Sequence, residues 1–264
     1  MNSRILMCRP DHFKVVYAIN PWMKNVEPVN TALAHRQWSN LKNTIEKCGA
    51  KVEVMPAPKG VPDVVFTANA AIVRDNKAYL SQFLHPERKD ERLHYEKWFK
   101  ENGFETEGCD IPFEGAGDAL FADHDKLFAA YGFRTEKRVY DKVQRFLGPI
   151  ATVVYCKLID EHYYHIDTAF CPLNSRVGVW HPYAFSEESR KRMENEMELL
   201  AVPKKDAANF ACNMVVVDGK HAIFQANNEE TAKLVEKKGF ESHEVDVSEF
   251  IKAGGACKCL TLAV

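Results

Sequence analysis

The 264-residue sequence predicts an α/β fold in which five repeated units close into a propeller-like ring. Three observations support this fold class. Segments with helical periodicity alternate with short apolar strand candidates, five clusters of similar composition recur about every 45 to 50 residues, and no linker interrupts the pattern. A repeat of this length is typical of a supersecondary unit that stacks on its neighbours. We therefore expect one continuous domain over residues 1–264.

Helices and strands alternate along the chain. Four segments have apolar residues at helical spacing: Thr31 to Lys47, Glu91 to Asn102, Glu187 to Leu200 and Glu229 to Lys238. Strand candidates lie between them: Val52 to Met55, Val153 to Tyr155 and Ala222 to Phe224. Gly49, Gly103 and Gly239 stand at helix ends, where a glycine commonly takes left-handed backbone. We expect each unit to contain a helix that leads into a strand.

Five clusters join small or polar residues to a short apolar run. They are FTANAAIV at 66–73, FEGAGDALF at 113–121, YHIDTAFC at 164–171, NFACNMVVV at 209–217 and GGACKCLTL at 254–262. An open stack of five units would need capping repeats, whereas a closed ring needs none. In a ring, each cluster lies near the axis, where backbones approach closely and polar groups distant in sequence share one pocket.

The composition excludes several classes of function. Basic and acidic residues nearly balance, at 35 and 37, and no basic block is interleaved with aromatic residues, so a nucleic-acid partner is not expected. Polar residues interrupt the amino terminus and no apolar run approaches the length of a membrane span, which predicts a cytoplasmic protein without membrane association. The sequence lacks a glycine-rich nucleotide-binding loop. We expect a small-molecule substrate and no cofactor, and we allow for a homo-oligomer.

The eight cysteines indicate reduced thiols, because disulfide frameworks are rare in intracellular chains of this size. Their spacing argues against structural zinc, since there is no C-x-x-C pair and only Cys257-x-Cys259 lies close together. The open question at this point is which cysteine is reactive.

The clusters contain a nucleophile, a base and several hydrogen-bonding groups: Asn69, Glu114, Asp118, His165, Asp167, Asn209, Asn213 and Cys259. A single buried cysteine or histidine is commonly a packing residue. Placement in corresponding parts of successive repeats is harder to explain by packing, which requires apolar residues. Buried carboxylates need a cationic partner, and a planar guanidinium suits carboxylates presented from two sides, such as Asp118 and Asp167.

The His165-x-Asp167 pair has two interpretations. If the segment is a strand, both side chains lie on one face. A metal site is the rival interpretation, but no third ligand lies at a suitable spacing nearby. We prefer a pairing of His165 with Cys259, because cysteine attacks as the thiolate, and a bound cation and a nearby imidazolium both favour its ionisation.

Several motifs carry a family resemblance. FEGAGDALF, YHIDT and KAGGACKCLTL resemble segments of the guanidino-group modifying enzymes with the pentein fold, which include arginine deiminases, dimethylargininases and amidinotransferases. Further segments resemble the arginine dihydrolases: YAINPWM (17–23), PDVVFTANA (62–70), FLHPER (83–88), GFR (132–134) and NFACN (209–213). The resemblance covers essentially the whole chain. It implies a pentein α/β propeller of five ββαβ units with pseudo-fivefold symmetry around a polar core.

The resemblance also implies residue roles. Cys259 would be the nucleophile and His165 the general acid and base, while Asp118 and Asp167 would hold the guanidinium. Asn69 matches an asparagine of the dihydrolases. Residues expected to bind the substrate are Asn20, Arg88 and Arg134 at its amino-acid end, together with Glu114, Phe66 and Asn209.

Cys257 departs from the family pattern, since it replaces the alanine expected in GGAAKCL. If this segment is a strand, Cys257 lies on the same face as Cys259. A disulfide with another thiol, or oxidative interference, is then conceivable. Cys259 remains the predicted nucleophile because of its place in the motif.

The activity implied is hydrolysis of L-arginine to L-ornithine, CO2 and two ammonia through thiouronium and carbamoyl intermediates on Cys259. Alternatives are a dimethylargininase that forms citrulline and dimethylamine, a deiminase that stops at citrulline, and an amidinotransferase that uses an amine instead of water. Asn69 favours the dihydrolase, because an amide accepts from a guanidinium and also donates to a ureido oxygen. An arginine-binding regulatory protein of the same fold is the non-enzymatic alternative.

Overall fold

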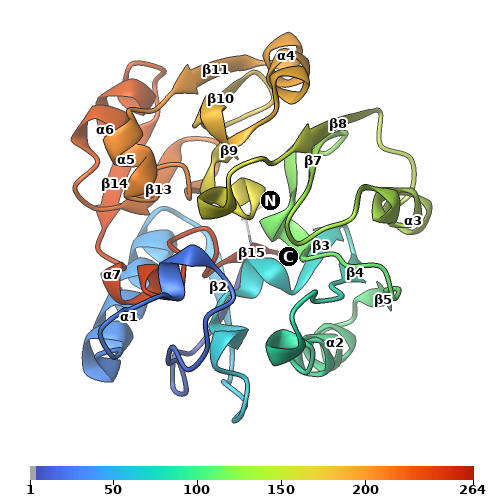
Figure 1. Ribbon diagram of the computed structural model, residues 1–264, viewed down its shortest axis with the longest axis vertical. Coiled ribbons are helices and arrows are strands. Elements are labelled where there is room, and N and C mark those ends of the chain that lie inside the picture. The colour runs from blue at the N-terminus through green and yellow to red at the C-terminus, as the bar shows by residue number, and fades with distance from the viewer. Residues whose placement is uncertain (1–3) are drawn as a thin grey trace.

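The computed structural model describes residues 4–264, so the first three residues of the predicted domain lie outside the described residues. Five three-stranded sheets surround a central axis, and the longer helices lie at the periphery (Figure 1). The inner strands are β3 (Ala71–Arg74), β6 (Ala119–Asp123), β9 (Phe170–Pro172), β12 (Val215–Val217) and β15 (Leu262–Ala263). The middle strands are β1 (Arg4–Cys8), β4 (Lys77–Leu80), β7 (Lys126–Tyr131), β10 (Val177–Trp180) and β13 (His221–Gln225). The outer strands are β2 (Lys51–Met55), β5 (Glu105–Glu107), β8 (Thr152–Lys157), β11 (Glu198–Ala201) and β14 (Glu241–Val245).

Every sheet has the same topology. The inner strand is antiparallel to the middle strand, and a helix connects the middle strand to a parallel outer strand. The connecting helices are α1 (Thr31–Lys47), α2 (Glu91–Glu101), α3 (Tyr140–Leu147), α4 (Glu187–Glu196) and α6 (Glu229–Glu236). Two short helices, α5 (Lys204–Ala208) and α7 (Ser248–Ile251), lie in connections. The ββαβ unit and the predicted α/β class are therefore confirmed.

The first sheet is assembled from both ends of the chain. Strand β15 pairs antiparallel with β1, with Ile5 opposite Ala263 and Leu6 opposite Leu262, and β1 pairs parallel with β2. The carboxyl terminus accordingly lies near the centre of the ring in Figure 1. A cavity of about 220 Å³ is lined by residues from the inner strand of every sheet. The ring is thus closed, as the sequence predicts.

Local sequence explains the helix bounds. The Asn30 side chain accepts a hydrogen bond from the Leu33 amide and so caps α1. Gly49, Gly103 and Gly239 all have positive φ angles, which confirms the predicted glycine stops. The largest difference from the predicted bounds is in α4, which ends at Glu196 instead of Leu200, because residues 198–201 form β11 beside β10. Helices α2 and α6 end one and two residues before their predicted bounds.

Four apolar clusters fill the space between sheets and helices. In α1, for example, Ala34, Trp38, Leu41 and Ile45 recur at three- and four-residue spacing and are all buried. Within residues 4–264, no helix is long and apolar enough to span a membrane.

Candidate active site

The five predicted clusters converge at one end of the axis. Each runs into an inner strand, and three of them form a 3-10 turn just before that strand: η3 (Thr67–Asn69), η5 (Gly115–Gly117) and η8 (Ile166–Thr168). Gly117 shows why these turns are rich in small residues. A Cβ atom at this position would lie 2.3 Å from Asn69 Nδ2 and 3.3 Å from His165 Nδ1. Any side chain at residue 117 would therefore push Asn69 and His165 away from the backbone.

Cys259 lies in the turn that precedes β15 and is buried. Its thiol donates a hydrogen bond to Asp167 Oδ2 at 3.2 Å, and Asn213 Nδ2 donates to the sulfur at 3.1 Å. The Asn213 carbonyl accepts from the amides of Lys258 and Cys259, which fixes the turn. Burial and the adjacent Asp167 charge raise the pKa of the thiol well above its usual range. In this structure the sulfur is therefore a thiol that donates to Asp167.

Asp118 and Asp167 are buried carboxyl groups with unused hydrogen-bonding capacity. Asp118 Oδ1 accepts from the Ile166 amide at 3.3 Å, whereas Oδ2 has no partner. Asp167 Oδ1 is also without a partner. Burial raises the pKa of Asp118 to about 6 and that of Asp167 to about 7. Leaving such groups unpaired is costly, so each of these two oxygens is suited to accept from a hydrogen-bonding ligand.

His165 is oriented by a buried acidic partner. Its Nε2 lies 2.8 Å from Glu114 Oε2. Arg134 Nη1 donates to the same carboxylate at 3.0 Å, and the guanidinium lies 4.6 Å from the centre of the Tyr164 ring. Although burial alone would raise it, Arg134 and His165 hold the pKa of the Glu114 carboxyl far below its usual range. Because this carboxylate only accepts, Nε2 carries the proton and Nδ1 is left for proton exchange.

Arg88 organises the opposite side of the site. Its Nε and Nη2 atoms donate to the two oxygens of Glu91 at 2.7 and 2.8 Å, a bidentate ion pair. Its Nη1 donates to Asn69 Oδ1 at 2.9 Å. The Asn69 carbonyl is thereby fixed, and its amino group points towards the Glu114 backbone carbonyl at 3.4 Å.

Several of these groups line a small cavity, whereas Asp118 and Asp167 do not. Its lining includes Cys259, His165, Asn69, Arg88, Arg134, Asn20, Phe66, Asp63 and Tyr164. The cavity has a volume of about 10 Å³, about enough for one water molecule. A more open pocket of about 290 Å³ adjoins it and shares Ile19, Asn20, Arg134 and Tyr164. The small cavity is therefore too small for an amino acid, and these four residues separate it from the open pocket.

Comparison with known proteins identifies the family. The sequence profile described as N,N dimethylarginine dimethylhydrolase, eukaryotic, matches residues 9–264. The chain belongs to this family. It is an amidine hydrolase of the guanidino-modifying pentein superfamily, which confirms the predicted enzyme class and the resemblance.

Two curated relatives differ in the reaction that they carry. The bifunctional arginine dihydrolase/ornithine cyclodeaminase ArgZ of Synechocystis sp. is 43% identical over 99% of this chain and 37% of its own length. The N(G),N(G)-dimethylarginine dimethylaminohydrolase of Mycobacterium tuberculosis is 34% identical over 99% of this chain and 85% of its own length. The chain thus spans little more than a third of ArgZ.

A solved structure supports the fold assignment. The crystal structure of the N-terminal domain of ArgZ bound to product, an arginine dihydrolase of cyanobacteria, matches with a TM-score of 0.96 and 42% identity. The match covers 100% of this chain and 98% of that chain. The pentein architecture predicted from the sequence is confirmed.

Most of the predicted amidine hydrolase site residues come together. Asn20 lines the cavity and ties two segments, since its side chain caps η1 (Pro21–Met23) and donates to the Ala253 carbonyl at 3.0 Å. Phe66 also lines it. Glu114 lies behind His165 and Arg134 and does not line the cavity, so its place is that of a positioning residue instead of a substrate ligand.

Asn209 lies outside the site. Its amide donates to the Ala226 carbonyl at 2.9 Å and to Asn228 Oδ1 at 3.3 Å, and it does not line the cavity. The asparagine of this cluster that contacts the nucleophile is Asn213, four residues later. The sequence contained this candidate, but composition alone could not decide between the two.

Two strand assumptions were wrong. Residues 166–168 form η8, so His165 and Asp167 do not share a strand face; His165 contacts Glu114, and Asp167 contacts Cys259. Cys257 and Cys259 lie in a turn, because the strand begins only at Leu262. Cys257 is fully buried in an apolar cluster, and burial raises the pKa of its thiol strongly. All eight cysteines are free thiols.

Asp63, Tyr164 and Glu91 are residues of the site that sequence reasoning missed. Tyr164 Oη donates to the Gly254 carbonyl at 2.7 Å, and Asp63 accepts from Tyr17 at 2.9 Å. One signal was available for Glu91: it follows Arg88 by three residues, which is the spacing at which opposite charges meet.

Proposed function

We propose that this protein is an arginine dihydrolase, which converts L-arginine and two waters to L-ornithine, CO2 and two ammonia. The observation that carries the proposal is the pair of buried carboxyl groups, Asp118 and Asp167, each of which has an oxygen without a partner. Asp167 also accepts from the Cys259 thiol through its other oxygen. A flat cation with several donors satisfies both oxygens at once.

The bound guanidinium activates its own nucleophile. In the empty site the negative charge of Asp167 opposes loss of the Cys259 proton. A guanidinium on Asp167 neutralises that charge and adds a positive one close to the sulfur, so the thiolate becomes favourable when substrate is present. Asn213 Nδ2 remains as a donor to the thiolate.

Cys259 and His165 both line the small cavity, which supports the following reaction. The thiolate attacks the guanidinium carbon, His165 gives a proton to the departing nitrogen, and ammonia leaves a covalent thiouronium. Water that has lost a proton to His165 hydrolyses this intermediate to the ureido product. A second attack on the ureido carbon releases ornithine and leaves a carbamoyl group on sulfur, which water converts to CO2 and ammonia.

Asn69 favours this second round. Its carbonyl is held by Arg88, and its amino group is the donor that a ureido oxygen requires. A carboxylate at this position would repel that oxygen. The similarity to the dihydrolase ArgZ supports the same choice, whereas the family profile and the mycobacterial relative favour dimethylarginine as the alternative substrate.

Product analysis tests the proposal. The protein is incubated with L-arginine or with asymmetric dimethylarginine, and ornithine, citrulline, ammonia and dimethylamine are quantified, with Cys259→Ser as the inactive control. We expect one ornithine and two ammonia per arginine. Citrulline as the end product, or preferred release of dimethylamine, would contradict the dihydrolase. Asn69→Asp is expected to shift the products towards citrulline.

A further inference from the structure

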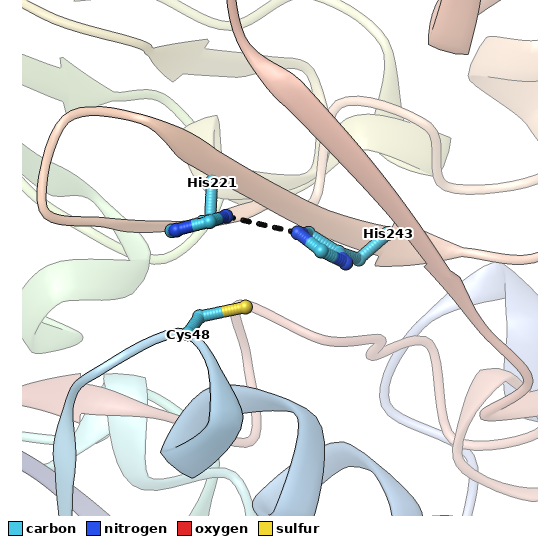
Figure 2. Close-up of side chains that lie close together, drawn as sticks. All are labelled: Cys48, His221 and His243. Atoms are coloured by element: carbon cyan, nitrogen blue, oxygen red, sulfur yellow. Dashed lines mark hydrogen bonds between the residues drawn. The ribbon is translucent and has the colours of Figure 1, made fainter.

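A second cluster of reactive side chains shares no residue with the candidate active site. Cys48, His221 and His243 each offer a ligand atom, and these atoms all lie within 4.8 Å of one another. It is the single grouping of this kind within residues 4–264. Figure 2 shows the sulfur of Cys48 facing the two imidazole rings. None of these residues takes part in the proposed hydrolysis.

The topology explains how the three residues meet. His221 lies on β13 and His243 on β14, and the register places Ile223 opposite His243. Because alternate residues share a face, both histidines lie on the same side of this sheet as Ile223. That side packs against α1, and Cys48 is the capping residue directly after the last residue of α1. The cluster thus connects the sheet β12-β13-β14 to helix α1.

The spacing of the donor atoms suits a metal ion. His221 Nδ1 lies 3.0 Å from His243 Nε2. Ligand nitrogens on a tetrahedral zinc ion with bonds of about 2.0 Å lie roughly 3.3 Å apart. Glu241 Oε2 lies 3.2 Å from the same His221 nitrogen, its side chain is half-exposed, and its Oε1 forms an ion pair with Lys220 at 2.6 Å. A fourth ligand is therefore at hand.

The chemistry of the three ligand atoms agrees with this geometry. One thiolate and two imidazoles form a donor set that zinc prefers, whereas magnesium and calcium prefer oxygen ligands.

We propose that Cys48, His221 and His243 form a zinc-binding site that connects α1 to strands β13 and β14, with Glu241 or water as the fourth ligand. Binding forms one Zn–S and two Zn–N bonds, and the Cys48 proton is released to solvent. The proton that the two imidazoles share moves to a ring nitrogen that faces away from the metal. The site stabilises the fold and is not needed for hydrolysis. The cysteine spacing of the sequence could not reveal it, because its ligands come from three separate elements.

Cobalt and zinc titrations test the proposal. The untagged, reduced full-length protein is stripped with a chelator and titrated with Co²⁺, and Zn²⁺ is then added in competition. We expect visible cobalt bands and a near-ultraviolet thiolate-to-cobalt band, both removed by Zn²⁺. Cys48→Ser should abolish the thiolate band, and His243→Asn should weaken zinc binding at least tenfold. Cys259→Ser and Cys109→Ser are matched controls that should retain both bands.

Thermal unfolding provides a second readout. A hundredfold excess of Zn²⁺ over its Kd should raise the Tm by roughly 5 °C or more. The Cys48→Ser variant should show no such shift and should keep its rate of arginine hydrolysis per folded molecule. Unfolding of each variant in chelator establishes that it folds. Cobalt bands that survive in Cys48→Ser, bands lost in Cys259→Ser, or no zinc binding by the folded protein would each overturn the proposal.

Discussion

Replacing Asp167 with asparagine separates two roles of one carboxylate. In the empty site, Asp167 accepts the hydrogen bond of the Cys259 thiol and its charge raises the thiol pKa. Asparagine removes the charge and offers a donor to the sulfur. We therefore expect the thiol of Asp167→Asn to ionise at lower pH than that of the unmodified protein, although the same substitution removes a partner of the guanidinium.

The expected loss of activity follows from burial. Asp167 is fully buried, and removing one partner of a buried ion pair costs about 3–5 kcal/mol. At about 1.36 kcal/mol per tenfold change, kcat/KM for arginine should fall by roughly 150- to 5,000-fold. The variant thus combines a more reactive free thiol with a much poorer enzyme.

The assay compares alkylation and turnover. The rate of Cys259 alkylation by iodoacetamide is followed against pH without substrate, with Cys259→Ser as the blank, and kcat/KM is measured on the same preparation. Asp206→Asn is the matched control, because Asp206 is also buried but bonds to Thr231 away from the cavity. An unchanged or raised thiol pKa in Asp167→Asn, or a loss of kcat/KM below tenfold, would refute the reasoning.

Three further predictions concern neighbouring residues. Asp167, with a pKa of about 7, must be ionised to hold a guanidinium. Below that pKa, arginine should therefore bind to Cys259→Ser about tenfold more tightly for each unit by which the pH rises. A pH-independent Kd by calorimetry would exclude this. Glu114→Gln leaves the buried Arg134 without its charged partner. Calorimetric melting should therefore show a Tm lower by roughly 6 °C or more, and kcat should also fall. An unchanged Tm would argue against the ion pair. Asn213→Ala removes a donor to the Cys259 thiolate and should lower kcat/KM by roughly 10- to 150-fold. The pH dependence of alkylation should show a higher pKa for this thiol. A lower thiol pKa would count against Asn213 as a donor to the thiolate.

The sequence predicts the fold better than the detailed site. Repeats with helix-ending glycines such as Gly49 and Gly239 determine the unit, because periodicity and backbone preference are local properties. Ring closure also follows, since five equal units without caps must bury their ends against one another.

Contacts within the site depend on backbone paths that periodicity does not encode. His165 and Asp167 diverge because a 3-10 turn precedes the inner strand, where alternation would have placed them together. The choice between Asn209 and Asn213 required the position of Cys259 in space. A family resemblance indicates which residue types such a site contains. Only the three-dimensional structure shows that Glu114 lies behind the imidazole of His165.

The strand that completes the first sheet comes directly after the nucleophile. Strand β15 pairs with β1 across almost the entire chain, and Cys259 lies three residues before it. During synthesis, the enzyme can therefore acquire neither its reactive sulfur nor a complete first sheet until residues 259–263 have emerged. Loss of these residues would remove the nucleophile and the inner strand of the first sheet together.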